Sequence, residues 1–127
     1  MKPLYAVRWL SQVQKDAEKA GLNEAALAQV NRQVHLLESW GDANALAVAD
    51  LVRLKGEYRD IFELRIKGGA VGKTNLRVFF AVLDAQRAVV VLGIKKKERS
   101  RGIEWVYDTM LDRLECVRHE MTRKGRK

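Results

Sequence analysis

The chain has 127 residues, and its 24 Lys and Arg against 16 Asp and Glu give a formal net charge of +8. The hydrophobic fraction of 47% and the single proline argue against long disordered, collagen-like or low-complexity segments. The length fits one domain over residues 1–127, and no apolar run approaches the roughly 20 residues of a membrane-spanning helix. The N-terminus shows no secretory-signal pattern and Cys116 is the only cysteine, so we expect a cytoplasmic protein without an intrachain disulfide.

The N-terminal half predicts one strand followed by two helices. Residues 4–10 are apolar and partly β-branched or aromatic, as in a strand. Ser11 is placed to cap a short helix, and Asn23 to cap a longer one over residues 24–40. Residues 43–52 show no clear pattern. In the longer helix the apolar residues that recur every three or four positions, and so form one core-facing stripe, are Leu27, Val30, Val34 and Leu37.

The C-terminal half predicts three strands and a closing helix. Residues 61–66 alternate between apolar and charged side chains, whereas residues 76–83 and 88–94 are β-branched and aromatic runs typical of central strands. A helix is expected over residues 103–121, followed by a basic tail at 122–127. The order β, α, α, β, β, β, α predicts an α+β fold, in which two N-terminal helices and a C-terminal helix gather on one side of a small antiparallel sheet.

The glycine-rich segment 68–74 imitates a phosphate-binding loop without meeting its requirements. The spacing from Gly68 or Gly69 to the Gly72-Lys73 pair is too short for that motif. The motif also opens a helix, whereas a strand-like run follows here. We therefore expect a hairpin loop and no nucleotide site.

The histidines and serines form no catalytic or metal-binding pattern. His35 and His119 each lie alone in an expected helix, and no second ligand stands at metal spacing. The serines lack the surrounding motif of a catalytic triad. We therefore expect neither a metal ion nor a cofactor.

The strongest local signal is the basic run at residues 95–101, which follows the last apolar strand. Alone, such a run is usually solvated surface. Arg77, however, interrupts an apolar strand, where an arginine is costly unless it faces an anion or a cleft. Glu63 and Arg65 project from one face of the preceding strand, so all these groups can converge on one side of the sheet. A structural ion pair between Arg77 and Glu63 is the alternative.

Such a cluster suits phosphate chemistry. Guanidinium groups bind phosphate through two parallel hydrogen bonds and stabilise charge that develops on a phosphorane-like transition state. A lysine crowded by like charges gives up its proton more easily, so it can accept the proton of a ribose 2′-hydroxyl. That hydroxyl then attacks its own 3′-phosphate and the RNA strand breaks, with no need for a metal ion.

Four short motifs follow one another between about residues 50 and 115. They are Arg53-Leu54-Lys55-Gly56, Ile61-Phe62-Glu63-Leu64-Arg65, Leu76-Arg77-Val78-Phe79-Phe80 and Lys95-Lys96-Lys97-Glu98-Arg99-Ser100. In this order they resemble bacterial toxins of the RelE/ParE superfamily, closest to its HigB-like, phage-related branch. The resemblance implies a RelE-like fold and a type II toxin–antitoxin system, in which a helix-turn-helix antitoxin binds the toxin in a hetero-oligomer.

The resemblance also implies roles for single residues. Arg77 matches the arginine that contacts the scissile phosphate in RNA-cleaving members, and Lys97 matches a basic residue that acts on the phosphate or the leaving group. Glu63 is either the general base or a partner of Arg65. Tyr107 lies one turn beyond the position of the RelE tyrosine, and can replace it only if the helix is entered differently. The expected RNA contacts are Arg65, Lys95, Lys96, Arg99 and Arg101, supplemented by the basic tail.

The branches of this superfamily differ in their targets. The RelE and HigB branches cut mRNA within the ribosomal A site, whereas the ParE branch poisons DNA gyrase. The resemblance therefore predicts a metal-independent, ribosome-dependent mRNA endoribonuclease that inhibits translation. The alternatives are a ParE-like gyrase inhibitor without nuclease activity and a non-catalytic nucleic-acid-binding prophage protein. We expect no membrane partner.

Overall fold

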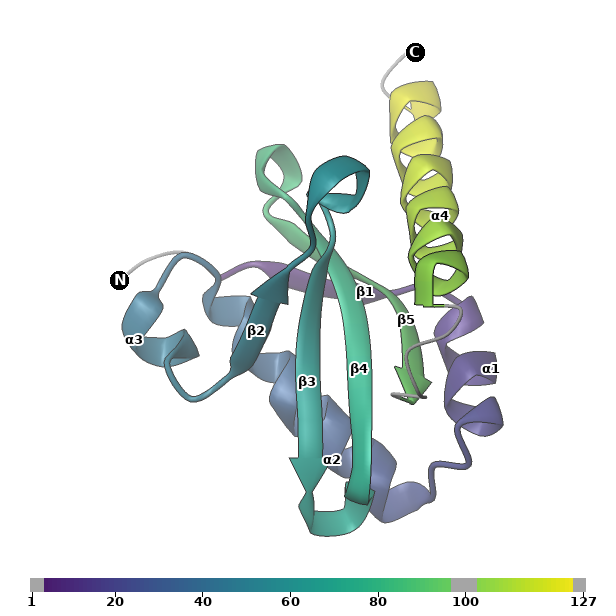
Figure 1. Ribbon diagram of the computed structural model, residues 1–127. Helices are drawn as coiled ribbons and strands as arrows, with labels where there is room; N and C mark the ends of the chain where they lie inside the picture. Colours follow the sequence, from purple (N-terminus) through teal and green to yellow (C-terminus); the bar gives the residue numbers. More distant parts are fainter. Residues whose placement is uncertain (1–3, 97–102, 125–127) are drawn as a thin grey trace.

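The computed structural model describes residues 4–96 and 103–124, and it is built around a five-stranded sheet (Figure 1). The elements are β1 (Ala6–Trp9), α1 (Gln12–Lys19), α2 (Glu24–His35), α3 (Ala43–Leu46), β2 (Asp50–Arg53), β3 (Phe62–Gly68), β4 (Gly72–Leu83), β5 (Ala88–Lys96) and α4 (Ile103–Lys124). Short 3-10 turns fill several connections between them. Within the described ranges, no helix combines the length and apolar character that crossing a membrane requires.

The strands are arranged in the order β1-β5-β4-β3-β2. Neighbours run antiparallel except β1, which runs parallel to β5. The sheet predicted to be antiparallel is thus mixed at one edge. The structure also adds α3 and β2 in and around the stretch that shows no clear sequence pattern, residues 43–52. Each of these two elements has four residues, which is too short to display a helical or strand period.

Helices α1 and α2 cover one face of the sheet. The predicted stripe of α2 is correct at Val30, Val34 and Leu37, which are buried against β4 and β5, but Leu27 is exposed and Ala26 is buried in its place. The α-helix ends at His35 and continues as a 3-10 turn to Ser39.

The two predicted caps have different outcomes. The Asn23 side chain accepts a hydrogen bond of 2.9 Å from the backbone N–H of Ala26, as a capping residue does. Ser11 stands at the N-cap position of α1 but has helical dihedral angles and makes no capping hydrogen bond. The prediction is confirmed for α2, and for α1 only the position is correct.

Helix α4 packs on the opposite face. Its buried side chains contact the other side of β4 and β5 and the residue before β3; the cluster includes Val106, Met110, Leu114, Ile61, Phe79, Ala81, Val90 and Leu92. The prediction that all helices gather on one side of the sheet is therefore wrong. Strands β4 and β5 carry buried apolar side chains on both faces, so each face has to be covered by a helix. Figure 1 shows α2 behind the sheet and α4 beside its upper part, so none of the described helices stands in front of the lower halves of β3 and β4.

An ion pair closes the edge of β5 where β1 stops. Strand β1 ends opposite Val91, so the next residues of β5 lack a strand partner on that side. Asp16 of α1 accepts a hydrogen bond from Ile94 N–H at 3.2 Å, and Arg113 of α4 donates one to the Leu92 carbonyl at 2.8 Å. Arg113 Nη1 also lies 2.6 Å from Asp16 Oδ2. One charged pair thereby joins α1, β5 and α4.

The segment 68–74 is the tip of the β3–β4 hairpin, as predicted. A 3-10 turn over Gly69–Val71 joins the two strands, and β4 continues from it with no helix. The side chain of Gln29 in α2 donates to the Gly68 carbonyl and accepts from Val71 N–H, each at 3.0 Å. The hairpin tip is therefore fixed against α2.

Candidate functional site

The strand register places three basic residues in one row across the sheet, which we call the basic row: Arg65, Arg77 and Lys95. Arg65 of β3 is the register partner of Arg77 of β4, and Arg77 is the register partner of Lys95 of β5. Register partners point to the same face, with neighbouring strands about 4.8 Å apart. That face is the one on which α4 packs, since Phe79, two residues after Arg77, contacts this helix. The next register partner beyond Arg65 is the exposed Asp50 of β2.

Glu63 joins two members of the basic row. It lies two residues before Arg65 on the same strand face, and its side chain is only 1% exposed. Its Oε1 lies 2.8 Å from Nε of Arg77, and its Oε2 lies 3.6 Å from Nη2 of Arg65. The ion pair between Arg77 and Glu63, which the sequence leaves open as an alternative, is therefore present.

The ion pair between Glu63 and Arg77 leaves hydrogen-bonding capacity unused on both side chains. Glu63 Oε1 is buried and accepts no hydrogen bond from the described residues, so its contact with Arg77 is a charge contact without hydrogen-bond alignment. A buried acceptor without a donor is costly, and it favours any donor that enters the site. Three cations against the carboxylates of Glu63 and Asp50 leave the row net positive. It can therefore still attract an anion.

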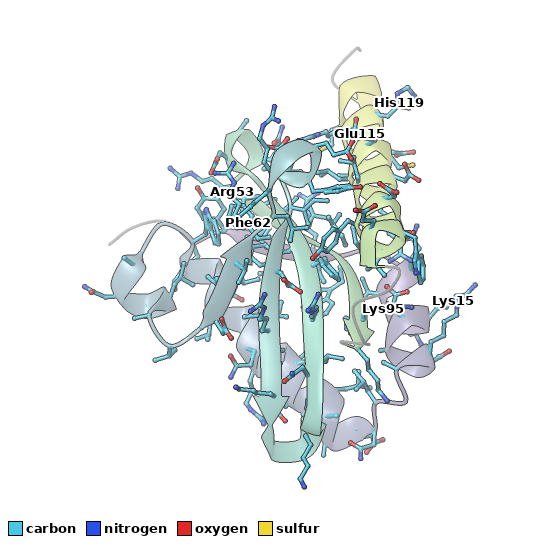
Figure 2. The ribbon with its side chains drawn as sticks, viewed as in Figure 1. Lys15, Arg53, Phe62, Lys95, Glu115 and His119 are labelled. Atoms are coloured by element: carbon cyan, nitrogen blue, oxygen red, sulfur yellow. The ribbon has the colours of Figure 1, made fainter. Side chains whose placement is uncertain are left out.

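At the β5 end of the basic row, Lys95 contacts the aromatic ring of Trp105. Lys95, labelled in Figure 2, lies at the end of β5. Its Nζ is 4.6 Å from the ring centroid of Trp105 in the first turn of α4. Trp105 is 56% exposed. Nothing in the sequence pattern singles out this residue, because an aromatic side chain on an amphipathic helix is usually part of the core.

Tyr107 lies between α4 and the sheet. Its ring is half-buried, with its centroid 6.0 Å from that of Phe79 and 5.4 Å from that of Tyr58. Phe79 is the register partner of Glu63, so Tyr107 comes close to the site, although its hydroxyl bonds to no described residue of the row. The hydroxyl of Tyr58 donates a hydrogen bond to the carboxylate of Asp108, and this bond raises the pKa of Tyr58.

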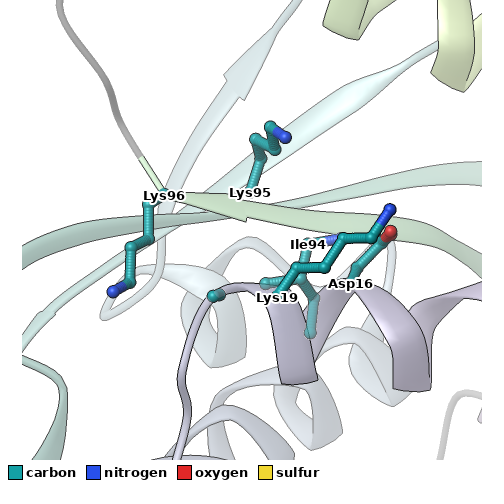
Figure 3. Close-up of a pocket in the computed structure, with 6 residues that line it drawn as sticks. Asp16, Lys19, Ile94, Lys95 and Lys96 are labelled. Carbon is teal, nitrogen blue, oxygen red and sulfur yellow. The ribbon is translucent and has the colours of Figure 1, made fainter.

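Lys96 does not join the row. Successive residues of a strand point to opposite faces, and Figure 3 shows Lys95 and Lys96 on opposite sides of β5. Lys96 borders small hollows beside α1 and the start of α2. Three further predicted site residues, Lys97, Arg99 and Arg101, lie outside the described residues, as does the end of the basic tail.

The remaining candidate ligands are dispersed. His35 and His119 are exposed on α2 and α4, and Cys116 is exposed on α4. Within residues 4–96 and 103–124, no three His, Cys, Asp or Glu side chains lie close enough together to hold a metal ion.

Comparison with known proteins rests on structure alone. No protein-family model matches the sequence, and no curated protein matches it. A structure of E. coli RelE with two arginine-to-alanine substitutions, in the free state, matches with a TM-score of 0.56 and 20% identity, covering 87% of this chain and 97% of that chain.

Two further structures give a TM-score of 0.50. The isolated E. coli RelE toxin is 24% identical, covering 87% of this chain and 98% of that one. A chain of the toxin–antitoxin complex RelBE2 from Mycobacterium tuberculosis is 22% identical, covering 74% of this chain and 99% of that one. The HigB-like branch stays a prediction. The chain has the α+β fold of the RelE toxins.

Proposed function

We propose that this chain is the toxin of a type II toxin–antitoxin system and that it cleaves mRNA on the ribosome as a metal-independent endoribonuclease. The observation that carries the proposal is the basic row beside the buried carboxylate of Glu63, on the face of the sheet on which α4 packs. The fold of the RelE toxins supports it.

The basic row is suited to hold the scissile phosphate. Arg77 is only 10% exposed, and its Nε faces Glu63, so its two terminal nitrogens remain without a partner among the described residues. These nitrogens form the planar fork that binds two phosphate oxygens. Arg65 and Lys95 flank Arg77 at register distance and add charge stabilisation as the phosphate gains negative charge in the transition state.

Glu63 is our candidate for the general base. Its Oε1 accepts no hydrogen bond from the described residues, so it has lone pairs for the proton of the ribose 2′-hydroxyl once RNA binding moves Arg77 or Arg65 aside and uncovers this buried atom. The 2′-oxygen then bonds to phosphorus while the bond from phosphorus to the 5′-oxygen breaks. The departing 5′-oxygen takes a proton from an acid, for which Lys97 and Tyr107 are the candidates. The products are a 2′,3′-cyclic phosphate and a 5′-hydroxyl end.

Mapping of RNA 5′ ends tests this proposal. Purified protein added to ribosomes and mRNA should give discrete cuts with 5′-hydroxyl ends, and Arg77→Ala should abolish them. Arg32→Ala is the matched control, because Arg32 is exposed on α2, on the other side of the sheet. Uncut message together with growth arrest would contradict the proposal and point to another target. Inhibition of DNA supercoiling by gyrase would then identify ParE-like action.

The proposal includes an antitoxin. A helix-turn-helix protein from a neighbouring gene, with an acidic segment that covers the basic row, would block the site by charge and shape. Co-expression of that gene should restore growth to cells that express this chain. Continued arrest despite a stable complex between the two proteins would contradict inhibition through this surface.

A further inference from the structure

The exposed ring of Trp105 extends the basic row by one step. Lys95 is the register partner of Arg77, and its ammonium group lies 4.6 Å from the centroid of the ring. The contact is a cation–π interaction, which orients the ring beside the row. Singly exposed apolar side chains are common on protein surfaces, but this one stands next to groups that suit phosphate.

The side chain of Trp105 is not needed to hold α4 against the sheet. The next residue, Val106, and Met110 one turn later are buried against the sheet and anchor the start of this helix. Trp105 keeps 56% of its surface in solvent. Its side chain can therefore be changed without opening the core.

We propose that Trp105, oriented by Lys95, is a stacking platform for an unpaired nucleobase beside the phosphate held on the basic row. The inference rests on the proposed function and narrows its substrate to single-stranded RNA. A base that is free of its partner exposes its π-face to an aromatic side chain, whereas a base in a duplex is stacked on both sides and shows only its edges. Trp105 would then select unpaired message at the site of cleavage.

Direct binding tests the platform without depending on cleavage. The probe is a labelled single-stranded RNA oligonucleotide with 2′-O-methyl groups, which lacks the attacking hydroxyl. Stacking of one base on an aromatic ring predicts that Trp105→Ala weakens binding about 5- to 150-fold. Trp105→Phe should recover part of this loss, because it keeps a smaller aromatic face.

Two controls separate stacking from charge and from folding. Trp9→Ala changes a tryptophan that is 40% exposed and lines a hollow between α1 and α2, so it should leave binding unchanged. Arg65→Gln should reduce the slope of log affinity against log salt by about 0.7, as removal of one phosphate contact does. Trp105→Ala should leave that slope unchanged, because stacking carries no net charge. Circular dichroism should show native helix content for each variant.

The outcomes distinguish the platform from the nuclease. Wild-type affinity of Trp105→Ala for the single strand, in a protein whose wild type cuts mRNA, would overturn the platform and leave the proposed function intact. An equal loss of affinity for a duplex of the same sequence would also overturn it, because a paired base cannot stack on the ring. If RNA binding depends on Trp105 but the wild-type protein cuts no message, the stacking platform would be supported and the proposed nuclease activity would be excluded.

Discussion

Glu63 has the most restricted environment of the candidate site residues. It is a buried carboxylate held between Arg65 and the nearly buried Arg77. Removal of one partner of a buried pair leaves the other charge uncompensated, which costs about 3–5 kcal/mol. We therefore expect Glu63→Ala to lower the free energy of unfolding by this amount, measured by urea denaturation.

Arg65→Ala is the control for that prediction. The side chain of Arg65 is 45% exposed, so its contact with Glu63 is screened by water and should contribute at most about 1 kcal/mol. Equal and small losses for the two variants would show that Glu63 is solvated in solution and that the Arg77 pair is weak. The same result would weaken the case for an unsatisfied base at this position.

At the scale of elements, the contact between Asp16 and Arg113 joins two helices to the edge of β5. Asp16→Ala would leave Ile94 N–H and the Arg113 guanidinium without this acceptor, at a cost of about 2–4 kcal/mol. A double-mutant cycle with Arg113→Ala measures the coupling between the two residues. The two single losses should sum to clearly more than the loss in the double variant, because either substitution breaks the same contact. Additive losses would contradict a shared contact.

A second pair, between Asp60 and Arg118, ties α4 to the turn before β3 and makes stability depend on pH. The hydrogen bond from Arg118 holds the pKa of Asp60 below its ordinary value. Since the folded pKa is the lower one, the stabilisation is present above the unfolded value of roughly 3.9 and is lost as pH falls through the folded pKa.

Asp60→Asn tests this contribution. The side chains of Arg118 and Asp60 are 40% and 49% exposed, so water screens the pair and the variant should be less stable than the wild type by at most about 1 kcal/mol near neutral pH. Thermal unfolding of both proteins should show this difference shrink toward zero in strong acid, where Asp60 is protonated. A difference that stays constant across this range would exclude the charge as its cause.

At the scale of the whole molecule, sequence periodicity predicts the elements better than their arrangement. The apolar strands over residues 76–83 and 88–94 and the closing helix are predicted correctly, but a helical pattern does not say which face of the sheet the helix will cover. Gly93 illustrates the missing information: a Cβ there would lie 2.4 Å from Cε of Met110 in α4, so this glycine makes room for the helix. A glycine within an apolar run shows only that something approaches closely.

The composition of the candidate site depends on the strand register, which the sequence pattern also does not give. Alternation places Glu63 and Arg65 on one face of β3, but it does not say which residues of β4 and β5 lie opposite. The three-residue turn Gly69–Val71, the register shift between Ile66 and Gly68 in the β3–β4 pairing and the one between Phe79 and Phe80 in the β4–β5 pairing decide that the basic row forms. Trp105 joins the site only through this arrangement, so no local motif could have predicted it.

The chain has a formal net charge of +8, and in the proposed function both the basic row and the C-terminal tail contact RNA. Four basic residues, Arg123, Lys124, Arg126 and Lys127, lie beyond the last strand and helix residues that form the row and its aromatic end. Contacts to phosphate strengthen binding without reading bases. Replacement of all four by Gln should therefore weaken RNA binding and reduce its salt dependence by up to about 0.7 in slope for each phosphate that the tail no longer neutralises. The positions of the cuts should stay the same, because in the proposed function they are set on the sheet. Mapped 5′ ends that shift with the tail charges would contradict this division and assign target selection to the tail.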